Sequence, residues 1–147
     1  MKRICLLSLI ACLLSLDAYS QSELKQNLLG NWKLEKNEMA TILLDAMQGS
    51  PKGNDLAQRA LAEDRLNFYS GDSLSTTIID GFEILQDSSI WTLNQRDSVI
   101  WWTNRFTPKG QRMKVLELDS ENLVLQYLSS NPNAGPWKLF YSKLEDE

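Results

Sequence analysis

The chain has 147 residues, contains no histidine and carries a formal net charge of −4. This length fits one domain. An acidic chain without a basic stripe suits neither nucleic acid nor an anionic membrane surface, so we predict neither partner. Without histidine there is no Ser-His-Asp triad and no imidazole metal site, and the seven glycines form no phosphate-binding loop.

The first twenty residues have the pattern of a secretory signal peptide. Lys2 and Arg3 precede an apolar run from Ile4 to Leu16, and Ala18-Tyr19-Ser20 forms a small-x-small cleavage site. The run is too short to span a membrane, and no other stretch approaches spanning length, so we expect no transmembrane segment. The sequence therefore predicts an exported protein whose residues 21–147 form one domain.

A second interpretation of the same segment remains open. Leu9-Ile10-Ala11-Cys12 has the form of a bacterial lipobox, in which the cysteine is lipidated and becomes the first residue. Cleavage before Gln21 predicts a periplasmic protein, whereas lipidation at Cys12 predicts association with the outer membrane. Both cysteines, Cys5 and Cys12, lie in this segment, so the predicted mature domain has no disulfide and no thiol nucleophile.

The predicted domain opens with a half-buried strand. Polar and apolar residues alternate from Asn31 to Lys36. Residues 37–65 then change to a helical period, interrupted at Gly49-Ser50-Pro51-Lys52-Gly53. One apolar helix face is formed by Met39, Ile42, Leu43, Ala46 and Met47. We expect a two-helix insert, which either covers an open end of the core or acts as a movable lid.

After the insert the hydrophobic period is two. The predicted strands are Leu66–Tyr69, Leu74–Ile79, Phe82–Gln86, Ile90–Asn94, Val99–Phe106, Arg112–Leu118, Leu123–Ser129 and Trp137–Leu144. Turn residues separate them, including Asp80-Gly81 and Asp87-Ser88. Short connections pair successive strands antiparallel, and closure removes exposed edges. We therefore expect an all-β, up-and-down antiparallel barrel of eight or nine strands.

The order of these features resembles a known family. Gly30-Asn31-Trp32 follows a signal, a long interruption comes next, and a strand meander contains the turn from Leu118 to Leu123 and closes with Trp137-Lys138-Leu139-Phe140-Tyr141. Over about residues 28–144 this pattern is similar to the small lipocalin-like domains of exported bacterial proteins.

The resemblance carries expectations about both ends of the barrel. It implies that Gly30 and Trp32 form a structural motif at the closed end, with the Trp32 ring covered by a cation from the last strand. Here Lys138 or Lys143 would supply that cation, since this strand has no arginine. The resemblance also implies that the helical insert hangs over the open mouth.

The aromatic residues are the main functional signal. The leading hypothesis is non-enzymatic binding or carriage of a small hydrophobic or amphipathic molecule in the barrel mouth, with no cofactor and no metal. Polar groups of Thr76, Thr92 or Tyr127 would orient the molecule. The candidate ligand-binding residues are Met39, Leu43, Met47, Phe68, Trp91, Trp101, Tyr127 and Tyr141. A glycosidase-like carboxylate pair is the catalytic arrangement that the composition leaves open, but we expect no enzyme.

A different function competes with ligand binding. Each aromatic residue is also explained as ordinary barrel core. Trp101 and Trp102 are neighbours on a predicted strand, so one faces inward and the other outward, where it needs a cover. The alternative is therefore a cell-envelope protein-interaction module, with a filled barrel core and a protein partner docked on an outer tryptophan.

Overall fold

The structure is a computed structural model, and part of the chain is described. The described residues are 23–39, 41, 55, 58, 62–80, 83–105, 107–129 and 135–145. The predicted signal segment with Cys12, and most of the predicted insert with Leu43 and Met47, lie outside them.

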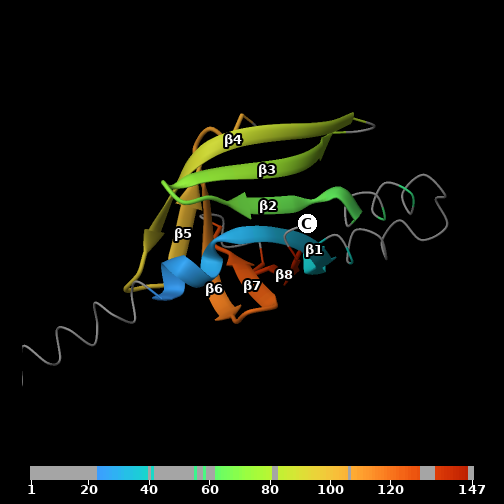
Figure 1. The fold of residues 1–147 in the computed structure, drawn as a ribbon. Coiled ribbons are helices and arrows are strands. Elements are labelled where there is room, and N and C mark those ends of the chain that lie inside the picture. Colours follow the sequence, from blue (N-terminus) through green and yellow to red (C-terminus); the bar gives the residue numbers. More distant parts are fainter. Residues whose placement is uncertain are drawn as a thin grey trace, which may run out of the picture.

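Eight antiparallel strands form one closed barrel (Figure 1). They are β1 (Gly30–Asn37), β2 (Arg65–Phe68), β3 (Ser73–Asp80), β4 (Glu83–Asn94), β5 (Val99–Trp102), β6 (Gln111–Leu118), β7 (Asn122–Tyr127) and β8 (Lys138–Lys143). Each strand pairs with the next one in sequence, and β8 pairs with β1 to close the barrel. The predicted all-β, up-and-down barrel is confirmed.

The strand count is eight because two predicted strands are one. We predicted a turn at Asp87-Ser88, since both residue types favour turns. In the structure β4 continues through them, and Asp87 and Ser88 pair with Thr76 and Ser75 of β3. Pairing along the whole length of β3 outweighs the local preference.

One end of the barrel is covered by a short helix. Residues 23–28 form this helix directly before β1. Leu28 is fully buried, and Leu24 packs against the core. We call this the closed end, and the opposite end, where β1 leads into the insert, the insert end. Within the insert, the described residues 38, 39, 41, 55, 58, 62 and 63 are helical. In the described part of the chain, no helix is long and apolar enough to cross a membrane.

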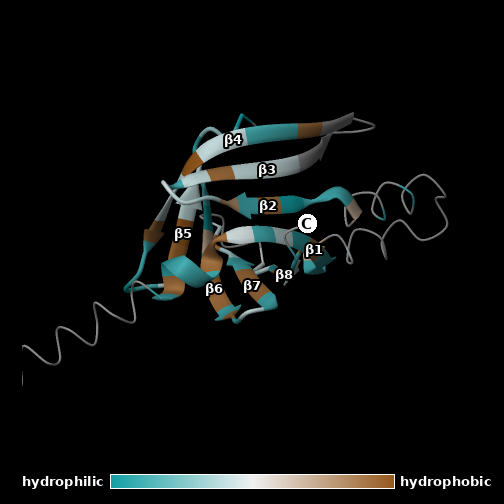
Figure 2. Cartoon of the chain, viewed as in Figure 1, coloured by the Kyte–Doolittle hydropathy of each residue, from teal (hydrophilic) through white to brown (hydrophobic). Residues whose placement is uncertain are grey.

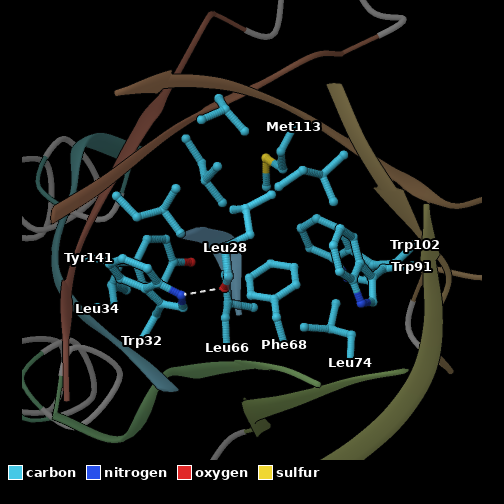
Figure 3. Close-up of a cluster of buried hydrophobic side chains, with 14 residues drawn as sticks. Leu28, Trp32, Leu34, Leu66, Phe68, Leu74, Trp91, Trp102, Met113 and Tyr141 are labelled. Atoms are coloured by element: carbon cyan, nitrogen blue, oxygen red, sulfur yellow. Dashed lines mark hydrogen bonds between the residues drawn. The ribbon is translucent and has the colours of Figure 1, made fainter. Parts of the chain in front are cut away.

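The core lies inside the barrel and is supplied by alternate residues of each strand. Apolar and polar segments change along the strands (Figure 2). Figure 3 shows the core side chains pointing from the wall toward the middle. They are Leu28, Trp32, Leu34, Leu66, Phe68, Leu74, Trp91, Ile100, Trp102, Met113, Val115, Leu123, Leu125 and Tyr141. Burial of each large apolar side chain stabilises the fold by about 1.5–3 kcal/mol.

Candidate functional site

The Gly-x-Trp motif lies at the closed end. The buried Trp32 indole donates its Nε1–H to the carbonyl oxygen of Leu28 at 2.8 Å. Lys143 holds its Nζ 5.2 Å from the centroid of the Trp32 ring, so the last strand does supply the covering cation, from Lys143. Gly30 has φ +126°, and a Cβ there would lie 2.8 Å from Cε of Lys143. These contacts tie the helix, β1 and β8 together around one indole.

Two candidate ligand-binding residues, Phe68 and Trp91, also lie toward this end. Their rings meet edge to face, with centroids 5.0 Å apart and an interplanar angle of 78°. Lys25 of the short helix places its Nζ 5.6 Å from the centroid of the Trp91 ring and pairs with Asp72 in the β2–β3 loop. Phe68 and Trp91 are thus core residues packed beneath the helix, away from the insert end.

The two adjacent tryptophans of β5 face opposite sides of the sheet. Trp102 is buried in the core, whereas Trp101 is 39% exposed. The Trp101 indole packs on Gly110, where φ is +89° and a Cβ would overlap the ring. Trp101 therefore does not line the interior, which corrects its place among the candidate ligand-binding residues, and Trp102 is the inward one of the pair. The outward indole is therefore covered in part by Gly110 of the same chain.

The remaining candidate residues are divided between the interior and the surface. Tyr141 is buried in the core, and Tyr127 is half-buried and packs against it. Met39, at the start of the insert, is 44% exposed. Thr92 is exposed on the outer face of β4. Of the predicted set, Tyr127 and Tyr141 remain as candidates on the inside of the barrel wall.

A polar stripe that we did not predict crosses the inner face of three adjacent strands. It consists of Asp64, Thr76, Asp87 and Ser89. We call this set the polar stripe. Cα partners show how it is built: Thr76 pairs with Leu66 of β2 on one side and with Asp87 of β4 on the other.

Alternation explains why the other two members share this face. Ser89 follows Asp87 by two residues on β4, and Asp64 precedes the core residue Leu66 by two. Asp64 and Ser89 are therefore diagonal neighbours of Thr76 on the two adjoining strands. Figure 2 shows the polar part of β4 in teal between apolar segments. The signal in the sequence was the polar run Gln86 to Ser89, in which we predicted a turn at Asp87-Ser88.

Several buried polar atoms on this side are unpaired. Thr76 is 5% exposed, yet its Oγ1 has no hydrogen-bond partner among the described residues, and neither has Oγ of Ser89. The same holds within the described chain for the indole N–H group of Trp91 on β4 and, on the neighbouring strand β5, for that of Trp102. Each unsatisfied buried group costs about 1–3 kcal/mol. This wall of the barrel therefore carries hydrogen-bonding capacity that the described protein does not use.

Asp64 carries a perturbed carboxyl group. Burial raises the pKa of Asp64 to about 7, and the positive charge of Arg65 opposes this shift only in part. The Asp64 carbonyl oxygen accepts the backbone N–H of Leu34 at 3.1 Å. This bond joins Asp64, the residue directly before β2, to β1. Burial, and secondly the Asp64 charge, raise the pKa of Tyr141 well above its ordinary value. The carboxyl and the phenol thus interact inside the barrel.

Asp87 is different because its carboxylate already has protein partners. Its Oδ2 accepts the backbone N–H of Arg105 at 2.7 Å, and its Oδ1 accepts that of Ser88 at 3.1 Å. The Nε of Arg105 lies 3.7 Å from Oδ1. The backbone hydrogen bond from Arg105 is the main cause of the lowered pKa of Asp87. Asp87 therefore fastens the loop after β5 to β4.

The wall that completes the barrel is mainly apolar. It is formed by β1 and by β5 to β8. Its inward side chains are Leu34, Trp102, Met113, Leu125, Tyr127, Leu139 and Tyr141. The two walls differ because β2 to β4 carry the polar stripe among their core residues Leu66, Phe68, Leu74 and Trp91, whereas the inward groups of the other strands are aliphatic or aromatic. Among the described residues no group of three His, Cys, Asp or Glu side chains could hold a metal ion.

Comparisons with known proteins give weak matches. No family model and no curated protein matches the chain. Fatty-acid-binding protein 1 of Echinococcus granulosus is similar in structure, with 13% identity, coverage of 82% of this chain and 99% of that one, and a TM-score of 0.45. The wild-type fluorescent protein UnaG is 14% identical over 80% of this chain and 97% of its own, with a TM-score of 0.40. An asparagine-to-alanine mutant of UnaG is 13% identical, with coverage of 83% and 99% and a TM-score of 0.41. Likeness at this level carries no functional inference, which has to come from the barrel itself.

Proposed function

We propose that the barrel binds a small amphipathic molecule between its two unlike walls. The apolar part of the molecule would pack against β1 and β5 to β8, and its polar part would reach the polar stripe. The observation that carries this proposal is Thr76, which is almost fully buried on the inner face and keeps an Oγ1 without a partner in the described chain. A threonine in that setting supports binding better than it supports a purely structural core.

The energetics of such binding are favourable on both sides. The hydroxyl groups of Thr76 and Ser89 are already desolvated and unpaired in the described chain, so a ligand that pairs with one of them removes an existing penalty of about 1–3 kcal/mol. The apolar part of the ligand contributes about 25 cal/mol for each Å² removed from water. The stripe then fixes orientation, and the apolar wall supplies most of the affinity.

A titration with medium-chain alcohols tests this proposal. We expect decanol to bind saturably with one molecule per protein, and to change the fluorescence of Trp91 and Trp102. Native mass spectrometry of the protein purified from its own host is the companion measurement, with a co-purifying amphiphile as the expected result. If no alcohol binds and repeated preparations carry no small molecule, the proposal is wrong.

One observation favours the alternative of a protein-docking module. Ile90 is 71% exposed and lies on the same outer face of β4 as Thr92, the Cα partner of Trp101. Single exposed apolar residues are normal, so this patch supports docking less well than the stripe supports ligand binding. Ile90→Ser provides the discriminating variant, because it should weaken a docked partner and leave decanol binding unchanged.

We also propose that the protein is exported. The pattern of Lys2, Arg3 and the apolar run to Leu16 supports this proposal. Intact mass measurement of the protein isolated from its host distinguishes the two processing routes. A mature chain beginning at Gln21 supports signal cleavage, and a lipid-modified chain beginning at Cys12 supports membrane anchoring. A full-length chain with an intact Met1 would contradict both.

A further inference from the structure

We infer that the polar group of the ligand is a protonated amine, held by Asp64 and the hydroxyl group of Thr76. The inference rests on the proposed function and specifies the chemistry of the same site. It excludes a carboxylate as the preferred polar group.

The placement of these two residues is the first step. Asp64 is a diagonal neighbour of Thr76, so one small group beside Thr76 can reach both side chains, whereas Ser89 lies on the opposite diagonal and is too far from Asp64 to share that group. An ammonium group has three hydrogen-bond donors and no acceptor. The two Oδ atoms of Asp64 and the Thr76 hydroxyl oxygen are acceptors in matching number.

The charge of the site is the second step. In the described barrel, the charged or titratable groups that interact with Asp64 are Arg65, its neighbour on β2, and Tyr141 of β8. Asp87, the other carboxylate of the stripe, is engaged by Arg105. A ligand carboxylate at Thr76 would meet the Asp64 charge at close range, whereas an ammonium would be attracted by it.

The third step is the coupling of ligand charge to proton binding. Burial raises the pKa of Asp64 to about 7 because Arg65 compensates the buried charge only in part. A ligand cation beside the carboxyl favours its ionised form and lowers this pKa. By linkage, an ammonium ligand must therefore bind more tightly as the pH rises through about 7.

Three probes with the same chain length separate the alternatives. Decylammonium, decanol and decanoate are titrated into the purified protein below their micelle concentrations, with tryptophan fluorescence and calorimetry as readouts. Decylammonium affinity should rise by about 10- to 30-fold between about pH 5.5 and about pH 8.5, the range over which a carboxyl with a pKa near 7 ionises. Decanol affinity should stay constant, and decanoate should bind most weakly at the higher pH.

Asp64→Asn is the decisive variant, and Glu63→Gln is its matched control. Glu63 is the preceding residue and is exposed, so removal of its charge changes the local sequence as little as possible. Asp64→Asn should abolish the pH dependence of decylammonium binding, and cooperative thermal unfolding of the variant shows that it is folded. Glu63→Gln should retain the full pH dependence.

Two results overturn the inference in different ways. If decanoate binds the unaltered protein as tightly as decylammonium at the higher pH, or if Asp64→Asn keeps the pH dependence, the amine assignment is wrong while the proposed binding function stands. If none of the three probes binds, the binding function fails and the inference fails with it.

Discussion

Lys143 of the last strand lies over Trp32 of the first, with its Nζ 5.2 Å from the indole centroid and its Cε next to Gly30. Gly30 and Trp32 of the motif therefore both lie against the side chain of Lys143. A residue with a Cβ at position 30 would displace the chain of Lys143, and without the ring the ammonium would lose its cation–π partner.

Gly30→Ala should destabilise the protein through two effects. The positive φ disfavours any L-residue, which costs about 1–2 kcal/mol, and the new Cβ displaces Lys143. Gly71→Ala is the matched control, because φ is +90° there and nothing lies within 4 Å of the added Cβ. We expect a larger loss of unfolding free energy at Gly30 in urea denaturation. Equal losses at the two positions would show that the contact with Lys143 contributes nothing.

Trp32→Phe should weaken the attachment of the short helix to the barrel. The substitution removes the hydrogen bond to the Leu28 carbonyl, leaves that buried oxygen unpaired, and opens space in the core. We expect a loss of about 2–4 kcal/mol in unfolding free energy. Trp101→Phe is the control on the outer face and should change stability little. Comparable losses in the two variants would contradict the assigned role of the buried indole.

Asp64 should lower the unfolding free energy of the unliganded protein as the pH rises from about 4 to about 7. The pKa of Asp64 is raised in the folded state, to about 7. Between the unfolded and folded pKa values the native state binds more protons, so raising the pH favours unfolding, and above about 7 the full penalty is present. Asp64→Asn should remove this slope and raise the melting temperature at about pH 8. Thermal unfolding at several pH values checks it, and a variant as pH-dependent as the parent protein would refute the prediction.

Thr76→Val should separate stability from binding. Valine has nearly the same shape and lacks the unpaired hydroxyl, so the unliganded protein should be as stable as the parent or more stable, by up to about 1–3 kcal/mol. Decylammonium should nevertheless bind several-fold more weakly, since one acceptor is lost. Thr77→Val, also buried but on the other face of β3, should leave affinity unchanged. If both variants bind equally well, Thr76 does not contact the ligand.

The fold was predictable because alternation and short turns recur along most of the chain. The alternation of Trp32 and Leu34 with polar residues predicted the inward face of β1, and both side chains are buried. The predicted closure into a barrel followed from connectivity alone, without knowledge of the register. The same reasoning did not determine which of Trp101 and Trp102 faces inward. Alternation shows that the two side chains lie on opposite faces of the strand, but it does not show which face is the inner one.

The polar stripe was missed for a physical reason. Asp87 and Ser88 have low intrinsic strand preference, and local composition therefore predicts a turn. Their actual state depends on long-range pairing with Thr76 and Ser75, and on the Arg105 loop that binds the Asp87 carboxylate. Prediction from local sequence therefore fails at Asp87, a polar residue whose side chain lies on the inner face of the barrel.

The exchange of partners along β4 has a mechanical consequence. Residues 83–90 are held to β3 and residues 91–94 to β5, so no part of β4 joins both neighbours through a backbone ladder at the same level. Beside Asp87 the two halves of the wall are joined by the bonds between the Asp87 carboxylate and Arg105, and by a hydrogen bond from the Arg105 guanidinium to the Gln86 carbonyl oxygen. Such a seam can yield before any ladder breaks, and acid that protonates Asp87 loosens it. The barrel thus has a seam that is held by side-chain bonds rather than by a backbone ladder, and this seam runs past its own polar stripe.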